Sequence, residues 1–476
     1  MKVSRILSKL PLFALMGMAS GVLMAQTVSG TGVQNPHSPR YGHEYRHGVV
    51  PTREAHEQMK AWEQTNRAGL AAASKTLAFG GGVDGIGVTS GKPKVYLIVY
   101  GSQWGTASTD ANGNMTLSND AVGAVPYLQK MFKGLGTNNE LWSGVMTQYC
   151  DGPLVAKGAT TCPANAPHVG YPTGGAFAGI WYDNSVASPS NATGLQLAQE
   201  AIKAAAHFGN TTPASNRYAQ YVILSPSGTH PDGFNTPSGS FCAWHDWNGD
   251  YAGATSNYGD IAFTNMPYVY DMGTSCGKGS VNGNTAQGNL DGFSIVEGHE
   301  YAETVTDQNP AGGWTNASSG QENADECSWI SSGQGASANV VLSTGSFAMQ
   351  STWSNDTNRC DISHPIVTGG TGNTATPLTS GVPVTGIALS ANTSKLYSIA
   401  VPAGRTTLTF KTTGGTGDAD IYAKLGSAPT TTSYLKKSDG STTVETITIT
   451  SPSAGTYYLL LNAYSTFSGV TLTATY

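Results

Sequence analysis

Charged residues are scarce in this sequence: Asp, Glu, Lys and Arg make up 11% of its 476 residues, against roughly 25% in an average soluble protein. Lys and Arg together number 24, Asp and Glu number 30, and no long run of basic residues occurs. Binding to nucleic acid generally needs a concentrated basic surface. We therefore expect no nucleic-acid partner.

Long apolar segments are also missing after the N-terminus. A membrane-spanning helix needs about 20 apolar residues, and no segment beyond residue 25 provides them. The opening "MKVSRILSKLPLFALMGMASGVLMAQT" instead has basic residues, a short apolar stretch and a small residue, Ala25. This pattern is typical of a signal peptide. We expect residues 1–25 to be removed and the protein to be secreted and extracellular, with no membrane span.

The sequence also lacks the Cys-x-x-Cys spacing of a structural zinc site. An even number of cysteines in an exported protein favours disulfide bonds. The sequence does not fix the pairing, and we expect each cysteine to pair with its nearest neighbour. The six residues are Cys150, Cys162, Cys242, Cys276, Cys327 and Cys360.

The first two thirds of the chain divide into an irregular segment and a compact domain. Residues 26–87 are poorly periodic apart from a helix expected within 52–75, and they form either a pro-segment or an N-terminal arm. Residues 88–366 contain apolar runs typical of buried strands, such as "KVYLIVY" and "YAQYVIL". Helices are expected at 121–135 and 192–208. This mixture indicates an α/β or α+β domain, which we expect to be catalytic.

The C-terminal part alternates polar and apolar residues. Residues 367–383 are rich in Gly, Thr and Pro and form a linker, and 384–476 have the period-2 pattern of a small β-sandwich. The segments "GTGDADIYAKLGSAPT" and "AGTYYLLLNAYSTFSGVTL" resemble the bacterial pre-peptidase C-terminal domain family. Such modules commonly follow secreted peptidases, so the resemblance implies a catalytic neighbour.

Two further expectations concern this C-terminal module. Asp418 and Asp420 precede a strand, where a polar turn is their expected role and calcium binding is the alternative. The module is also a candidate for contact with a cell surface or a polysaccharide.

The letters His-Glu-Tyr occur twice. Zinc hydrolases use His-Glu-x-x-His on a helix, because side chains four residues apart share one face. "GHEYRHG" has this pattern at His43, Glu44 and His47, but Pro39, Gly48 and Pro51 would interrupt a helix. We interpret this first copy as a chance match or a polar arm.

The second copy, "GHEYAETVTD", has Glu303 where the second histidine would stand. Its surroundings favour a helix, with Asp291 as the expected N-cap and apolar residues on either side of the motif. His299 and Glu303 then share a face, and Glu300 lies beside them. Zinc accepts carboxylate oxygen as a ligand, so this segment predicts a metal-binding helix.

A downstream acidic segment, "GQENADECSW", supplies the remaining groups. We expect Glu322 to be the third metal ligand and Asp325 to support the ligands without touching the ion. This arrangement resembles that of thermolysin-type metallopeptidases, in which a downstream glutamate completes the site. The missing second histidine is a departure from them.

The middle of the chain, about 94–365, resembles the EXORDIUM-like, or phosphate-induced protein, family. The resemblance rests on "KVYLIVYGSQW", "FCAWHDW", "HEYAETVTDQNPAGGW" and "ENADEC". It implies an extracellular α/β domain carrying a His/Glu/Glu group.

Two other histidines are candidates for a catalytic role. Either His245 or His364 could donate a hydrogen bond to an oxyanion. For His245, metal binding and a structural role between Trp244 and Trp247 remain alternatives.

The sequence therefore predicts a secreted, metal-dependent endopeptidase that hydrolyses protein or peptide substrates. Zinc, held by His299, Glu303 and Glu322, would activate water, and Glu300 would be the general base. The alternative is a non-catalytic extracellular protein that binds cell wall or polysaccharide. A third possibility is that the metal is purely structural.

Overall fold

The computed structural model describes residues 35–66, 74–163, 166–367 and 375–476, except 392, 427, 430, 432 and 433. The expected signal peptide, 1–25, and residues 368–374 of the expected linker lie outside the described residues. Within the described part, no helix is both long enough and apolar enough to cross a membrane.

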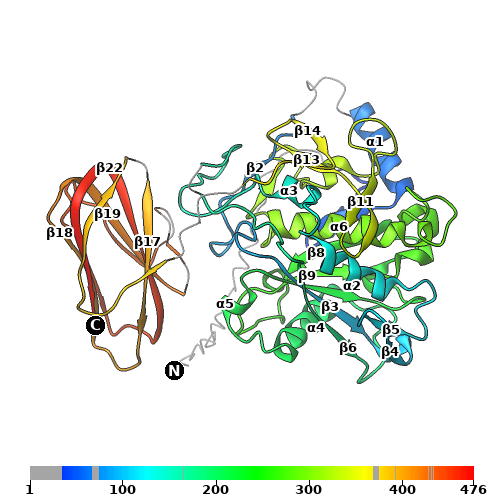
Figure 1. Cartoon of the computed structure of the whole chain (residues 1–476), viewed down its shortest axis with the longest axis horizontal. Helices are drawn as coiled ribbons and strands as arrows, with labels where there is room; N and C mark the ends of the chain where they lie inside the picture. The colour runs from blue at the N-terminus through cyan, green and yellow to red at the C-terminus, as the bar shows by residue number, and fades with distance from the viewer. Residues whose placement is uncertain are drawn as a thin grey trace, which may run out of the picture. The chain divides into compact units, whose positions relative to one another are not determined.

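A six-stranded mixed sheet forms the centre of the larger part of the molecule (Figure 1). Its order is β1-β8-β9-β7-β3-β6. Strand β3 is parallel to β6 and β7, and β7 is parallel to β9, whereas β8 and the edge strand β1 run antiparallel to their neighbours. The strands are β1 (His47–Pro51), β3 (Lys94–Tyr100), β6 (Phe177–Asp183), β7 (Ala219–Leu224), β8 (Phe241–Trp247) and β9 (Ala262–Met266).

Helices cover both faces of this sheet. Neighbouring residues of a strand point to opposite faces. Gln220 donates a 2.9 Å hydrogen bond to Thr304 on α6 (Asp291–Thr306), while Tyr221 donates a 2.7 Å bond to Asn216 at the end of α5 (Pro213–Asn216). Helix α2 (Ala124–Gly134) packs against α6, and α4 (Gly194–His207) packs against β7 and β9. This mixed layering confirms that α-helices and β-strands share one domain.

Helix α6 is buried along its whole length. Apolar residues at Phe293, Ile295 and Val305 pack in the core, so its polar residues are carried into the interior with them. The prediction that Asp291 is the N-cap is wrong. Asp291 is the first helical residue, and its carboxylate accepts hydrogen bonds from the backbone N–H groups of Val281 and Asn282, which hold the preceding loop.

Shorter elements surround the central sheet. They are helices α1 (Arg53–Asn66) and α3 (Trp142–Met146) and four strand pairs: β2 (Ala78–Phe79) with β10 (Trp314–Thr315), β4 (Ala107–Thr109) with β5 (Met115–Leu117), β11 (Ala338–Leu342) with β12 (Gly345–Met349), and β13 (Thr352–Ser354) with β14 (Arg359–Asp361). The expected helix within 52–75 is thus α1, and the two other expected helices are α2 and α4.

The six cysteines form three disulfides, Cys150–Cys162, Cys242–Cys276 and Cys327–Cys360. This is the nearest-neighbour pairing expected from the sequence. The third bond joins a short 3-10 helix, Asp325–Cys327, to β14 and so anchors the acidic segment that precedes it.

The C-terminal part is a small β-sandwich, as the alternation predicts. One long strand, β22 (Gly455–Thr475), pairs first with β17 and β19 and then with β16 and β18, so it belongs to both sheets. Leu459 and Leu461 point into the core between the sheets. The other strands are β15 (Thr376–Pro377), β16 (Val384–Leu389), β17 (Ser394–Val401), β18 (Thr407–Thr413), β19 (Thr416–Leu425), β20 (Lys436–Ser438) and β21 (Thr446–Thr450).

Candidate metal centre

Helix α6 places His299, Glu300 and Glu303 in the interior, each 0% exposed. His299 Nε2 lies 3.1 Å from Glu303 Oε2, as a separation of one helical turn requires. The acidic segment meets the helix here, because the backbone N–H of Asp325 donates a 2.8 Å hydrogen bond to Glu303 Oε1. Glu322, three residues earlier in the same segment, donates a hydrogen bond from its backbone N–H to Asp325 Oδ2.

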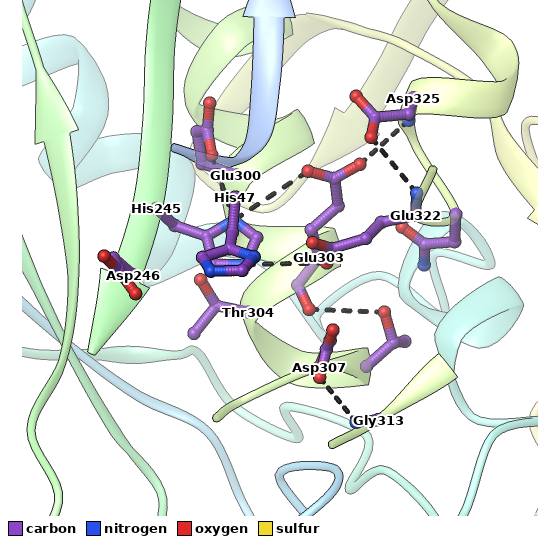
Figure 2. A network of polar contacts seen from close by, with 12 residues as sticks. His47, His245, Asp246, Glu300, Glu303, Thr304, Asp307, Gly313, Glu322 and Asp325 are labelled. Carbon is purple, nitrogen blue, oxygen red and sulfur yellow. Dashed lines mark hydrogen bonds and ion pairs between the residues drawn. The ribbon is translucent and has the colours of Figure 1, made fainter. Parts of the chain in front are cut away.

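Strand β8 brings His245 into the same group (Figure 2). Its Nδ1 lies 3.2 Å from Glu300 Oε2 and 3.8 Å from Glu303 Oε2, and its Nε2 lies 3.5 Å from Glu322 Oε2. His245 is 1% exposed. Of the roles considered for His245, these contacts agree with a metal ligand or a group that touches the reacting atoms.

The potential ligand atoms divide into two groups that share one residue. One contains His245, Glu303 and Glu322, and the other contains His299, Glu303 and Asp325; within each, the atoms lie within 4.8 Å of one another. The expected triad of His299, Glu303 and Glu322 is therefore split between them. Asp325 has the position of a ligand instead of the supporting position predicted for it, since its Oδ1 lies 3.5 Å from His299 Nε2.

Several of these buried atoms have no hydrogen-bond partner. They are His245 Nε2, His299 Nε2, Glu300 Oε1, Glu303 Oε2 and Glu322 Oε2. Buried polar atoms without partners are rare and costly. Imidazole nitrogen and carboxylate oxygen are ligands that zinc prefers. The residues present therefore fit a bound divalent cation.

The pKa values of the group reflect burial and the crowding of its carboxylates. Burial raises the pKa of Glu303 to about 7, and the neighbouring Asp325 carboxylate adds to the shift. Burial also raises the pKa of Glu300 and of Glu322 well above the usual value. Burial opposes a charged His299, yet Glu303 and Asp325 raise its pKa to about 10. A nearby cation would relieve this crowding of carboxylates.

Gln350 orients the His299 ring. Its Oε1 lies 3.3 Å from His299 Nδ1, and its Nε2 donates a 2.7 Å hydrogen bond to the backbone oxygen of Ala324. The second bond fixes which amide atom faces the ring, so Nδ1 carries the proton and Nε2 faces the carboxylates. Metal-binding histidines commonly have such a partner. No pattern in the sequence pointed to Gln350.

The structure does not bring His364 into this group. Its Nε2 lies 3.4 Å from the Asp356 carboxylate, and its Nδ1 lies 2.7 Å from the backbone oxygen of Pro365. The catalytic role expected for His364 therefore lacks structural support. The residue follows β14 on a separate loop, which its backbone N–H ties to Leu141.

The N-terminal copy of the motif is not helical. His43 lies in a turn with its Nδ1 3.1 Å from Tyr45 Oη, and His47 begins β1 with its Nε2 3.1 Å from Asp250 Oδ2. The next residue, Gly48, lies directly against the buried group: a Cβ there would be 2.0 Å from Glu303 Oε2. The interpretation of this copy as a chance match or a polar arm did not predict this proximity.

A cleft of about 560 Å³ lies beside the group, and Asp325 is the member of the group that lines it. Asp325 and His56 line it, together with Lys75, Asn316 and Trp329. The Asp325 side chain is 13% exposed, whereas those of His299 and Glu303 are fully buried. Asp325 is therefore the member of the group that is exposed to solvent.

The following similarities to known proteins concern the C-terminal part. Residues 393–463 match the family "Bacterial pre-peptidase C-terminal domain". The chain is 53% identical over 99 residues to an "Extracellular protease" of Xanthomonas campestris pv. campestris, which is 21% of this chain and 17% of that protein. It is 38% identical over 95 residues to a "Zinc metalloprotease" of Helicobacter pylori, covering 20% and 37% of the two chains.

The relatives do not share one catalytic chemistry. An "Alkaline serine exoprotease A" of Vibrio alginolyticus is 37% identical over 99 residues, covering 21% of this chain and 18% of that one. The solution structure of vEP C-ter 100 is 28% identical in sequence to this chain, with a TM-score of 0.18. The match covers 21% of this chain and 100% of that one. The chain thus spans well under half the length of these curated relatives. What the comparisons establish is a pre-peptidase C-terminal domain, a module that also occurs in named extracellular proteases and metalloproteases.

Proposed function

We propose that the protein is a secreted metal-dependent endopeptidase, with zinc as the metal. One observation carries the proposal: five buried nitrogen and oxygen atoms of adjacent histidine and glutamate side chains have no hydrogen-bond partner and face one another. The residues that would hold the metal are His245, His299, Glu303, Glu322 and Asp325. Named proteases among the relatives of the C-terminal domain support a protein or peptide substrate.

Glu300 is the proposed general base. When bound, a divalent zinc ion supplies Lewis-acid chemistry and makes water more acidic. Glu300 uses Oε2 to face His245 Nδ1 at 3.2 Å, which leaves Oε1 without a partner. That oxygen can take a proton from water and pass it to the leaving amine. Burial, which raises the pKa of Glu300, strengthens it as a base.

The cleft beside Asp325 is the proposed path for the substrate. Its volume of about 560 Å³ lies within the range of roughly 300–1,000 Å³ usual for ligand sites. Most of its lining residues are polar, and they include residues of both charges, such as Lys60 and Glu63. A polar peptide backbone would find hydrogen-bond partners along it.

The remaining expectations stay proposals. Among them is the EXORDIUM-like resemblance of about 94–365. Calcium at Asp418 and Asp420 and polysaccharide contact through the C-terminal domain also remain to be tested. For residues 26–87, the described contacts favour an arm that stays with the fold over a removable pro-segment. Val50 and Phe79 belong to the same apolar core as the central sheet.

A structural metal centre is the second candidate. The side chains of His299, Glu300 and Glu303 are fully buried, which suits an ion that holds the acidic segment to α6. The two candidates differ in whether the ion meets a substrate.

Hydrolysis of casein by the purified secreted protein tests the proposal. We expect activity that a chelator abolishes and added zinc restores, together with zinc in the untreated protein by elemental analysis. Zinc without hydrolysis of casein or of a mixed peptide library would support the structural centre instead. Protein that binds no divalent metal would overturn both.

A further inference from the structure

We propose that the site binds two divalent cations and that Glu303 bridges them. This inference rests on the proposed function and adds the number of ions. His245 and Glu322 would complete the site of the inner ion, and His299 and Asp325 that of the outer ion. The basis is the division of the potential ligand atoms into two groups with Glu303 in common.

Distances within each group suit one ion. A cation about 2.0–2.1 Å from each ligand requires ligand atoms no more than about 4.2 Å apart. In the outer group, His299 Nε2 lies 3.1 Å from Glu303 Oε2 and 3.5 Å from Asp325 Oδ1. In the inner group, His245 Nε2 lies 3.5 Å from Glu322 Oε2, and one ligand atom from each of His245, Glu303 and Glu322 lies within 4.8 Å of the other two.

The free atoms are distributed between the two groups. His299 Nε2 has no hydrogen-bond partner in the outer group, and neither His245 Nε2 nor Glu322 Oε2 has one in the inner group. Glu303 Oε2, the atom that faces both imidazoles, is also without one. A single ion in either group would leave the free nitrogen of the other histidine buried without a ligand, with only a carboxylate oxygen 3.1 Å from His299 Nε2 or 3.5 Å from His245 Nε2 beside it.

Charge also favours two ions. Glu300, Glu303, Glu322 and Asp325 converge here, and three of them are almost completely buried. If all four are ionised, one divalent cation offsets half of their charge and two offset all of it. Buried charges are retained when they are paired or bind metal. Pairs of metal ions that share ligands are a known arrangement in hydrolases.

The two sites differ in access to solvent. Asp325 lines the cleft, whereas Glu322 is 1% exposed and does not. We therefore expect a chelator to remove the outer ion first and the inner ion more slowly.

Metal content of the full-length secreted protein tests the proposal. Samples are loaded with zinc, freed of excess by gel filtration and measured by elemental analysis. We expect two zinc ions per chain in the wild type, one in Asp325→Asn, one in Glu322→Gln, and a loss of both in Glu303→Gln. Asp356→Asn is the matched control, because Asp356 faces His364 outside the group. It should keep both ions.

The outcomes separate this inference from the proposed function. One ion in the wild type, lost entirely in both Asp325→Asn and Glu322→Gln, would overturn the two-ion site and leave a metal-dependent peptidase intact. No bound ion would overturn both. Cobalt provides a second measurement that does not depend on the variants: two equivalents should bind the wild type with changes in visible absorption, and saturation at one equivalent would contradict the proposal.

Discussion

The two His-Glu-Tyr segments have the same three letters and entirely different environments. In α6, the segment that begins at His299 is helical and 0% exposed at His299, Glu300 and Glu303. In the N-terminal segment, His43 is half-buried in a turn, Glu44 is exposed, and His47 begins an edge strand. The complete zinc motif is therefore not on a helix, and the incomplete motif carries the buried candidate ligands.

This contrast shows that the backbone conformation of a motif decides which of its side chains lie together. Four residues along a helix make one turn and bring side chains together. In the N-terminal segment, the backbone turns between His43 and His47, and their rings face different partners, Tyr45 and Asp250. Gly48 nevertheless places this segment against Glu303, so the two copies meet in space.

The largest expected difference between the copies is catalytic. Glu300→Gln keeps the size of the side chain and removes its basicity, so we expect kcat to fall about 10²–10⁴-fold with metal content unchanged. Casein or peptide hydrolysis and elemental analysis measure the two quantities. Glu44→Gln, the same change at the exposed glutamate of the first copy, should alter neither. A similar loss in both variants would end the distinction between the copies.

The next effect concerns the contact between the copies. Gly48→Ala places a Cβ 2.0 Å from Glu303 Oε2 and requires a φ of +49°. Gly42→Ala requires a φ of +77° and meets nothing within 4 Å. The left-handed backbone alone costs about 1–2 kcal/mol, and overpacking adds about 1–3 kcal/mol. Denaturant unfolding should therefore show a larger loss of stability for Gly48→Ala, and equal losses would argue against the contact.

Lowering the pH should destabilise the protein through His47, the second histidine of the first copy. Burial lowers the pKa of His47 from 6.5 to about 4, and Arg40 contributes. Between those pH values the unfolded chain binds a proton that the folded protein excludes. His47 thus makes its whole contribution to the free energy of unfolding above pH 6.5. This contribution decreases as the pH falls towards 4, by at most about 1.4 kcal/mol per pH unit. His47→Gln should reduce this slope in unfolding measured from pH 4 to 7.5. An unchanged slope would show that other groups cause it.

The smallest effect is expected for His43→Ala. The ring is half-buried, and its Nδ1 lies 3.1 Å from Tyr45 Oη. We expect a loss of stability below about 1 kcal/mol and unchanged hydrolysis of casein. If His43→Ala abolished hydrolysis while Glu300→Gln retained it, the roles of the two copies would be the reverse of those proposed.

Features set by local periodicity were accessible from the sequence alone. The i, i+4 spacing placed His299 and Glu303 on one helical face, and period-2 alternation predicted the sandwich. The nearest-neighbour disulfides were also expected. The Asp291 cap was not predicted correctly, because its carboxylate binds a loop that the local pattern does not describe.

The composition of the site was decided by tertiary structure. The antiparallel strand β8 brings His245 to α6, and the acidic segment, anchored by Cys327–Cys360, brings Asp325 within 3.5 Å of His299. Gln350 arrives from the turn after β12, and His364 stays with Asp356. Sequence periodicity determines which side chains share a face of one element. Which elements face one another depends on sheet order and core packing. In this protein, sheet order and core packing bring together residues whose proximity no spacing in the sequence predicts.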